Sequence, residues 1–347
     1  SDPLTSLWLR NAAISGEIPT LRELSEGRVY PYRYGHAIWA YIGGRWGDAA
    51  IGQILRLAGE GVPYHITFER ILNIDLDELS ADWQSAIRRT YLPQLANLRE
   101  AREDARGLIT SERGSGRLNV APSISPDGRL IAYLAQQESG DVELMLANAS
   151  TGEVIRRLQR GAGFDAHFGS LRYIHSAGTW APDSRRFAFS ALRGGRDVLV
   201  ILDAERADRL REFSIPGVGE ITNPSWSPDG RHIVFSGLSG GITDLYLLDL
   251  ETGDTRKLTD DKFAELQPAF SPDGRRIAFS TDRFGTDLDL LKYGAYEIGI
   301  LEIGTGKIER VKGMGGTKNI NPQWSADGTE IFFISNRSGI PNVYRVR

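Results

Sequence analysis

The chain has 347 residues, and 41 Lys and Arg stand against 45 Asp and Glu, so its formal net charge is -4 at pH 7. This near balance argues against a nucleic acid or an anionic membrane as a partner held by bulk electrostatics. The absence of cysteine excludes disulfides, thiolate metal sites and cysteine nucleophiles. The 39 Gly and 15 Pro indicate many tight turns, and no apolar run is long enough to predict a membrane-spanning segment.

Residues 1–106 contain no Lys and carry apolar residues three and four positions apart, which is typical of amphipathic helices. The clearest predicted helix begins after Asp75, a capping residue that is followed three positions later by Glu78. Its buried stripe should consist of Leu76, Leu79, Trp83, Ile87 and Tyr91. Shorter helices are predicted over residues 34–41, 48–57 and 66–71, with Asp48 as the cap of the second.

After residue 106 the chain changes to short runs rich in Val, Ile, Phe and Tyr, which predict strands joined by tight turns. One turn sequence recurs five times, at spacings of 56, 46, 44 and 54 residues. The copies are Ser125-Pro-Asp-Gly128, Ala181-Pro-Asp-Ser184, Ser227-Pro-Asp-Gly230, Ser271-Pro-Asp-Gly274 and Ser325-Ala-Asp-Gly328. An apolar residue precedes each copy and an alternating strand follows it, so each repeat accounts for four antiparallel strands in about 45 residues.

This period is that of a β-propeller blade. We therefore predict a mainly β fold, a β-propeller of four-stranded antiparallel blades with five repeats visible, preceded by a small α-helical domain. The helical segment should cover residues 1–106 and the propeller residues 107–347. The Asp and Gly of each turn should shape the hairpin, and the apolar residue before it should pack between neighbouring blades. The repeated positions are thus interpreted as scaffold rather than as catalytic residues.

Residues 223–236, Asn-Pro-Ser-Trp-Ser-Pro-Asp-Gly-Arg-His-Ile-Val-Phe-Ser, resemble the repeat of TolB-like β-propellers, a WD40-like Pro-Asp repeat family. The resemblance extends through Asp244-Leu-Tyr246 and Leu258-Thr259 and covers about residues 107–347. It implies a docking platform for a protein or peptide, in a periplasmic or extracellular location. In some relatives such propellers gate serine peptidases, so a gating role is a further alternative.

Residues 5–95 are similar to the helical tail of gluzincin-type, peptidase MA-like zinc peptidase domains. The match rests on Tyr34-Gly-His-Ala-Ile-Trp-Ala-Tyr-Ile42, Gly52-Gln-Ile-Leu55, Phe68-Glu-Arg-Ile-Leu72 and Leu79-Ser-Ala-Asp-Trp83. The sequence departs from that family because it has no His-Glu-x-x-His motif. Zinc catalysis needs two His on one helical turn as metal ligands, a third ligand, and a Glu that acts as the base. If the chain is part of an enzyme, the resemblance implies a metallopeptidase whose zinc site lies outside it.

Two expectations concern closure of the ring. TolB-like propellers usually have six blades, and the fifth repeat here ends at its third strand, Asn342–Arg347, so the chain is expected to be a piece of a longer protein. The alternative is closure within the chain. In that case residues 107–111, which resemble a fourth strand, would complete the fifth blade and leave no free sheet edge.

Other chemical patterns favour structural interpretations. The Gly-x-Ser-x-Gly motif of a nucleophile elbow occurs once, at Gly237-Leu-Ser-Gly-Gly241. It lies between two predicted strands rather than between a strand and a helix, so we interpret it as a hairpin turn. His167 and His175 lie near Asp165 in a long loop over residues 161–176, and their spacing matches no strong metal-ligand pattern. We expect no metal, no cofactor and no catalytic residues. This loop and the insertion over residues 286–295 are candidate partner loops, because propellers vary their partners there.

Polar residues before the turns form the candidate binding site. They lie on the strands that should line the channel, where groups from several blades could bind a peptide end, a small ligand or a cation. The alternative is that they only solvate the channel. The set is Asn119, His175, Asn223, Glu265, Gln267, Asn319 and Asn321.

The leading hypothesis from the sequence is a non-catalytic binding propeller that docks a protein or peptide at its channel mouth and long loops. The first alternative is an accessory fragment that positions substrates for a larger secreted zinc metallopeptidase. The second is the gating propeller of a serine peptidase.

Overall fold

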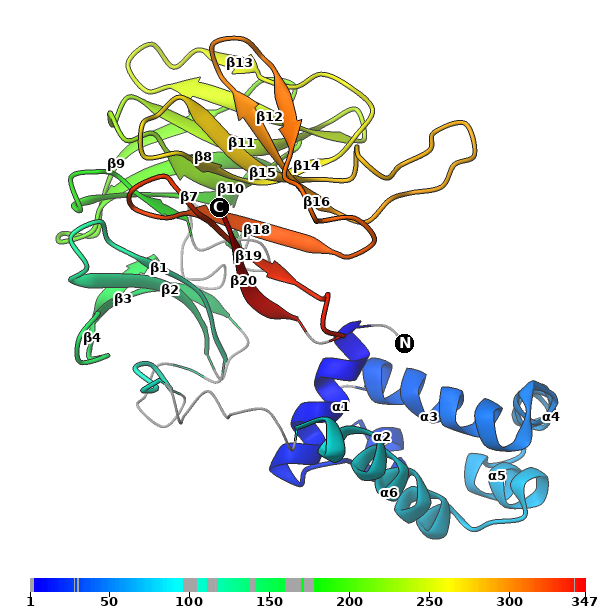
Figure 1. Ribbon diagram of the computed structural model, residues 1–347. Coiled ribbons are helices and arrows are strands. Elements are labelled where there is room, and N and C mark those ends of the chain that lie inside the picture. The colour runs from blue at the N-terminus through cyan, green and yellow to red at the C-terminus, as the bar shows by residue number, and fades with distance from the viewer. Residues whose placement is uncertain are drawn as a thin grey trace. The chain divides into compact units, whose positions relative to one another are not determined.

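The structure is a computed structural model, and it describes residues 3–27, 29, 31–95, 105–110, 116, 118–137, 141–159, 170–171, 178–339 and 341–347. The chain folds into two compact units, Ser1–Arg106 and Gly107–Arg347. The first unit is helical and the second is built from antiparallel strands (Figure 1).

The described part of the helical unit contains six helices. Their order is α1 Pro3–Ser15, α2 Leu21–Ser25, α3 Pro31–Trp46, α4 Asp48–Gly59, α5 Tyr64–Leu72 and α6 Leu76–Leu95. The predicted helices correspond to α3 to α6, whereas α1 and α2 were not predicted. In this part of the chain no helix is long and apolar enough to cross a membrane.

Capping explains where several of these helices begin. Asp75 caps α6 as predicted, because its Oδ1 accepts a hydrogen bond from the backbone N–H of Glu78 at 2.8 Å. Thr20 and Glu23 form a reciprocal capping box at the start of α2. The prediction for Asp48 is wrong: Gly47 occupies the cap position of α4 with φ of 83°, and Asp48 is the first helical residue.

The core of the helical unit forms around α6. Leu79 and Trp83 of this helix are almost fully buried, together with Ile42 of α3. The predicted stripe is confirmed from Leu76 to Ile87, and Tyr91 packs against the same core while half-buried. Burying one such large side chain contributes about 1.5 to 3 kcal/mol, so this face suffices to hold α6 against its neighbours.

The second unit consists of five antiparallel sheets, the blades, arranged in sequence order. Blade 1 contains β1 Leu118–Ile124, β2 Leu130–Gln136, β3 Val142–Asn148 and β4 Val154–Gln159. Blade 2 contains β5 Ser170–Leu171, β6 Thr179–Trp180, β7 Arg186–Arg193, β8 Arg196–Asp203 and β9 Asp208–Ser214. Blade 3 contains β10 Glu220–Trp226, β11 His232–Ser239, β12 Ile242–Asp249 and β13 Thr255–Lys257. Blade 4 contains β14 Glu265–Phe270, β15 Arg276–Thr281, β16 Glu297–Glu302 and β17 Ile308–Arg310. Blade 5 contains β18 Asn319–Trp324, β19 Ile331–Ser335 and β20 Asn342–Val346.

These blades confirm the predicted fold class, a mainly β propeller of antiparallel blades after a small helical region. In blade 2 the short strands β5 and β6 both pair with β7 and together take the innermost position. In blade 5 the described strands number three. The described residues 107–110 of the segment expected to complete it do not pair with β20: Leu108 and Ile109 pack instead on blade 1, against the core that contains Tyr133.

Neighbouring blades are joined by the apolar residue before each turn, as predicted. The indole N–H of Trp180 donates to the carbonyl of Ser123 in blade 1 at 2.9 Å. Trp324 makes the same bond to Ala269 of blade 4 at 3.1 Å. Ile124 is the exception, since it belongs to the first blade and is 62% exposed. Each aromatic thus packs toward the blade that precedes it in the chain.

The repeated turns have the geometry that their residues predict. Asp229 Oδ1 accepts the backbone N–H of Arg231 and the hydroxyl of Ser227, and Gly230 takes φ of 73°. Successive turns also touch: a Cβ added to Gly274 would lie 3.2 Å from the ring of Pro228. The predicted turn over Gly237–Gly241 is confirmed, since Ser239 pairs with Ile242 across it.

Candidate binding site in the propeller channel

The innermost strands of four blades share one irregular backbone feature. In β1, β10, β14 and β18 the pairing register shifts at a β-bulge. The residue within each bulge adopts φ between 50° and 58°, and a proline follows it. These left-handed residues are Ala121, Asn223, Gln267 and Asn321.

A left-handed conformation is costly for residues other than Gly, and Asn tolerates it best. The following proline cannot donate a ladder hydrogen bond, and it disfavours the right-handed helical region for the residue before it. Bulge and proline together therefore redirect the backbone at the same level of each blade. In blade 2 Gly178 takes the proline position, and a Cβ there would lie 2.2 Å from the carbonyl oxygen of Ala188.

These bulges surround a cavity of about 380 Å³ to which all five blades contribute. Its volume lies within the range of small-molecule and cofactor pockets. Among the described residues, the lining carries hydroxyls, prolines and four side-chain amides but no charged side chain and no His. The lining residues are Ala121, Pro122, Ser123, Ile124, Gly178, Thr179, Asn223, Pro224, Ser225, Gln267, Pro268, Asn321 and Gln323.

Part of this polar lining is already engaged between blades. Thr179 Oγ1 accepts the backbone N–H of Trp226 at 3.2 Å, and Ser225 Oγ accepts that of Phe270 at 3.2 Å. Gln267 Oε1 accepts the backbone N–H of Asn321 at 2.8 Å. These bonds fix the inner strands of successive blades against one another.

Other amide groups at the cavity are not engaged. The side-chain amides of Asn321 and Gln323 make no hydrogen bond within the described residues. The Nε2 group of Gln267 makes none there either, because the network uses only its Oε1. Since a primary amide carries two donors and an accepting carbonyl, the cavity wall offers both kinds of group without a charge.

Three predicted site residues therefore line the cavity together, namely Asn223, Gln267 and Asn321. Asn319 does not: it is fully buried, and its Nδ2 donates to the carbonyls of Met314 and Thr317, which holds the approach to β18. Asn119 is half-buried, lies outside the lining and approaches the carbonyl of Gly116 at 3.5 Å. His175 lies outside the described residues, as do His167 and Asp165.

Glu265 is also fully buried and belongs to an ion-pair network rather than to the cavity lining. Its Oε1 lies 2.7 Å from Arg283 Nη2, which also contacts Asp261 Oδ2 at 2.7 Å. Burial raises the pKa of the Glu265 carboxyl to about 7, against the opposing effect of Arg283. This glutamate is thus a buried titratable group inside blade 4.

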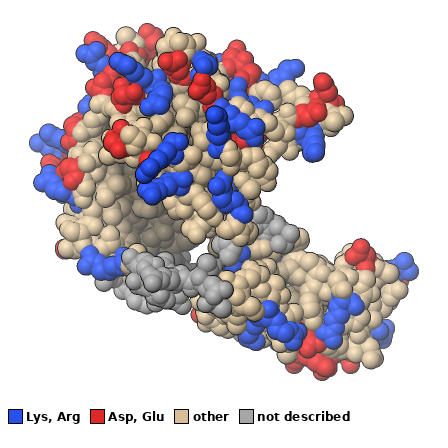
Figure 2. Space-filling model, viewed as in Figure 1, with Lys and Arg blue, Asp and Glu red and all other residues tan. Residues whose placement is uncertain are grey.

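Sequence reasoning missed several lining residues, including Gln323, Ser123 and Ser225. They lie two positions after the left-handed residue, so they return to the same side of the strand. A search for polar residues on both sides of each proline would have found them. Figure 2 shows acidic and basic groups interspersed over the upper part of the propeller face. Within the described residues no group of His, Cys, Asp and Glu could hold a metal ion.

The comparisons with known proteins agree with this architecture. The sequence model of the TolB beta propeller domain family matches residues 168–288. The structure is similar to TolB from Acinetobacter baumannii, with 19% identity and a TM-score of 0.54, over 66% of this chain and 51% of that one. It is also similar to the putative TolB from Agrobacterium tumefaciens, with 20% identity and a TM-score of 0.51, over 66% of this chain and 76% of that one. No curated protein matches the sequence.

At these identities the likeness establishes a TolB-like β-propeller fold. The match spans about half the length of the Acinetobacter protein. The family match begins at residue 168, so it lends no support to the peptidase resemblance of residues 5–95. That resemblance stays a prediction.

Proposed function

We propose that this chain is a non-catalytic binding module that docks a protein or peptide partner at the propeller channel and on its long loops. The observation that carries the proposal is the cavity of about 380 Å³, where unengaged amides of Gln267, Asn321 and Gln323 face ligand-sized space. Asn321 and Gln323 are exposed and Gln267 is half-buried, so a ligand seated there would replace the water around these amides. An extended peptide backbone offers one N–H and one C=O per residue for that exchange.

The composition of the lining favours a peptide over an ionic ligand. A charged ligand would lose hydration without meeting an opposite charge, whereas amides can satisfy neutral peptide groups. The prolines and Ile124 supply apolar contact area for side chains. The part of the lining that the structure describes includes no side chain that titrates near neutral pH, which favours binding over acid–base catalysis there. We also propose a periplasmic or extracellular location, which the TolB-like fold supports.

Peptide selection tests this proposal. Random twelve-residue peptides displayed on phage would be selected on the purified chain, and the affinity of the recovered peptides measured by fluorescence anisotropy. We expect Asn321→Ala combined with Gln323→Ala to weaken binding at least tenfold.

Asn73→Ala is the matched control. Asn73 ends α5 with φ of 52°, so both asparagine substitutions place alanine in a left-handed conformation. The control should bind the peptides like the unchanged chain. Recovered peptides that bind both variants equally would show that the channel is not the docking site.

A further inference from the structure

The segment between β15 and β16 extends away from the rest of blade 4 (Figure 1). Asp287 and Lys292 pair across it, each backbone N–H donating to the other residue's carbonyl at 2.8 and 2.9 Å. We call residues 286–294 the hairpin tip. It corresponds to the insertion that the repeat spacing singled out.

Hydrogen bonds within the hairpin tip stabilise its turn. Asp287 Oδ1 accepts the backbone N–H groups of Asp289 and Leu290, both at 3.1 Å. Thr286 Oγ1 accepts the N–H of Gly294 at 2.9 Å. A Cβ on Gly294 would lie 2.4 Å from the backbone of Gly285, so only glycine allows the two arms to cross this closely.

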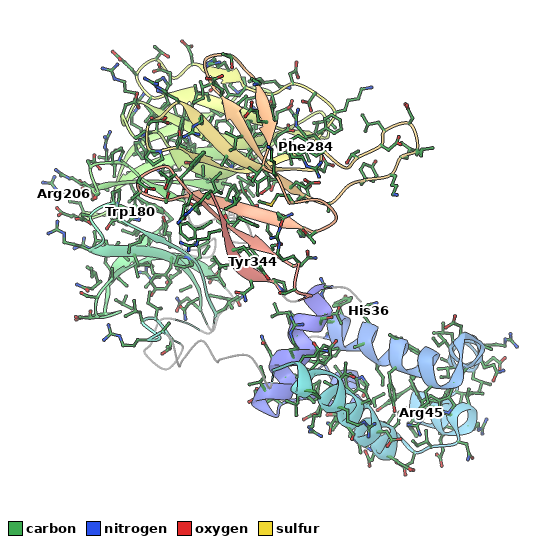
Figure 3. The ribbon with its side chains drawn as sticks, in the orientation of Figure 1. His36, Arg45, Trp180, Arg206, Phe284 and Tyr344 are labelled. Atoms are coloured by element: carbon green, nitrogen blue, oxygen red, sulfur yellow. The ribbon has the colours of Figure 1, made fainter. Side chains whose placement is uncertain are left out.

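The base of the hairpin is fixed to the blade. Phe284, labelled in Figure 3, lies under the guanidinium of Arg310, whose carbon is 5.7 Å from the ring centre. Arg310 in turn forms a two-bond ion pair with Glu297 at the start of β16, at 2.6 and 2.8 Å. Both ends of the segment are therefore anchored.

This ordered tip presents apolar side chains to solvent. Leu290, Leu291 and Tyr293 are 75%, 73% and 74% exposed, and Leu288 lies beside them at 36%. Leu291 also has φ of 51°, a conformation that costs energy for leucine. A strained loop that turns adjacent leucines outward is expected where the exposed surface is used for binding.

We propose that the hairpin tip is a plug that enters an apolar pocket on a protein partner. The rim of that pocket would carry a cation opposite Asp289 and an acid opposite Lys292. This deepens the proposed function, on which it rests, by naming the chemistry of the partner. Because hydrogen bonds within the tip already shape its turn, we expect docking to cost little conformational entropy.

The charges at the tip separate a protein partner from a lipid surface. Asp289 lies between Leu288 and Leu290, so inserting the leucines into hydrocarbon would carry a carboxylate with them at high cost. Asp287, Asp289 and Lys292 sum to one negative charge, which anionic lipids repel. A protein pocket can instead pair both signs at its rim while it buries the leucines.

The experiment begins with a photoreactive benzoylphenylalanine in place of Tyr293, crosslinked in the cells that make the chain. The captured protein is then purified, and its affinity for the unmodified chain is measured by calorimetry. We expect Leu290→Asp and Leu291→Asp each to weaken binding at least tenfold. Asp289→Lys should weaken it several-fold and reduce its dependence on salt. Leu210→Asp, at an exposed leucine of β9, is the matched control and should leave the affinity unchanged.

Two results would contradict the proposal that the hairpin tip is a plug. One is that no protein crosslinks to it, and the other is that the tip variants and the control bind the captured protein with equal affinity. Binding to vesicles of phosphatidylcholine with one third phosphatidylglycerol that Leu290→Asp abolishes would assign the tip to a membrane. Self-association in sedimentation, lost in the same variant, would assign it to a second copy. The channel variant that combines Asn321→Ala with Gln323→Ala is measured against the same captured protein. If only that variant weakens binding, the plug fails and the channel proposal stands; if neither site matters, both fail.

Discussion

The two ends of the inner strands repeat in different ways. At the turn end the same residues recur, and their polar groups are satisfied locally, as when Asp229 accepts bonds from Ser227 and Arg231. At the bulge end the backbone recurs while the side chain changes from Ala121 to Gln267 and Asn321. The turn end therefore specifies the blade, whereas we propose that the bulge end, whose side chain varies among these four blades, defines the ligand.

The largest expected effect concerns the aromatic beside the turn. Trp180→Ala should lower the free energy of unfolding by about 3 to 5 kcal/mol, because it empties a buried inter-blade site and removes the bond to Ser123. Ile124→Ala at the matching position of blade 1 should cost about 1 kcal/mol or less, since Ile124 is largely exposed. Urea denaturation compares the two. Equal losses would mean that this position does not act through the preceding blade.

A second prediction concerns pH and Glu265, two residues before the bulge of blade 4. The pKa of its carboxyl is about 7 in the folded chain and 4.5 ordinarily, so between these values the folded state holds a proton that the unfolded state releases. Stability from this group is therefore greatest below pH 4.5, falls as pH rises to 7 and is level above. Relative to Glu265→Gln, the unchanged chain should lose roughly 1 to 3 kcal/mol over that range.

Denaturant titrations at several pH values measure that difference, because the other titrating groups cancel between the two proteins. A difference that does not change between pH 4.5 and 7.5 would show that Arg283 keeps Glu265 ionised despite its burial.

The smallest expected effect on stability is that of Asp183→Ala, and it tests whether the turn end acts on stability alone. Asp183→Ala removes the acceptor for the backbone N–H groups of Arg185 and Arg186 and should cost about 1 kcal/mol of stability. Although burial opposes it, these bonds hold the pKa of Asp183 below its ordinary value. The stability that Asp183 contributes is fully present above the ordinary pKa of aspartate. It is lost as the pH falls through the lowered pKa that Asp183 has in the folded chain.

Asp183→Ala should leave peptide affinity unchanged, whereas the channel pair Asn321→Ala and Gln323→Ala should lose affinity. Thermal unfolding and anisotropy on the same preparations check this. A loss of affinity in Asp183→Ala at full folding would remove the distinction between the turn and the bulge.

The fold was predictable because its signal is local. The turns, the strand after each turn and the capped helix α6 all depend on residues a few positions apart. The unpredicted helix α1 buries small residues such as Ala12 and Ala13, which contribute little to apolar periodicity. Closure by residues 107–111 was wrong for the described residues of that segment, because packing against blade 1 competes with pairing on β20.

The candidate site was predictable only in part. The bulge adds a residue to the inner strand, so simple alternation does not tell which polar side chain faces the channel. Contacts with residues outside their own strands turn Glu265 and Asn319 away from the cavity. Glu265 pairs with Arg283, and Asn319 donates to the carbonyl of Met314. The close approach of Gly285 and Gly294 at the base of the hairpin tip is likewise a contact between residues nine positions apart, which the repeat pattern does not show.

The lining of the cavity has a thermodynamic consequence. Successive blades are joined by contacts such as those of Pro228 with Gly274 and of Trp180 with Ser123. If one blade opens, these contacts destabilise mainly the blades next to it. A ligand seated in the cavity would touch all five inner strands at once. Occupancy would then link blades that share no contact, and a chain that opens blade by blade when empty would unfold as a single cooperative unit when bound.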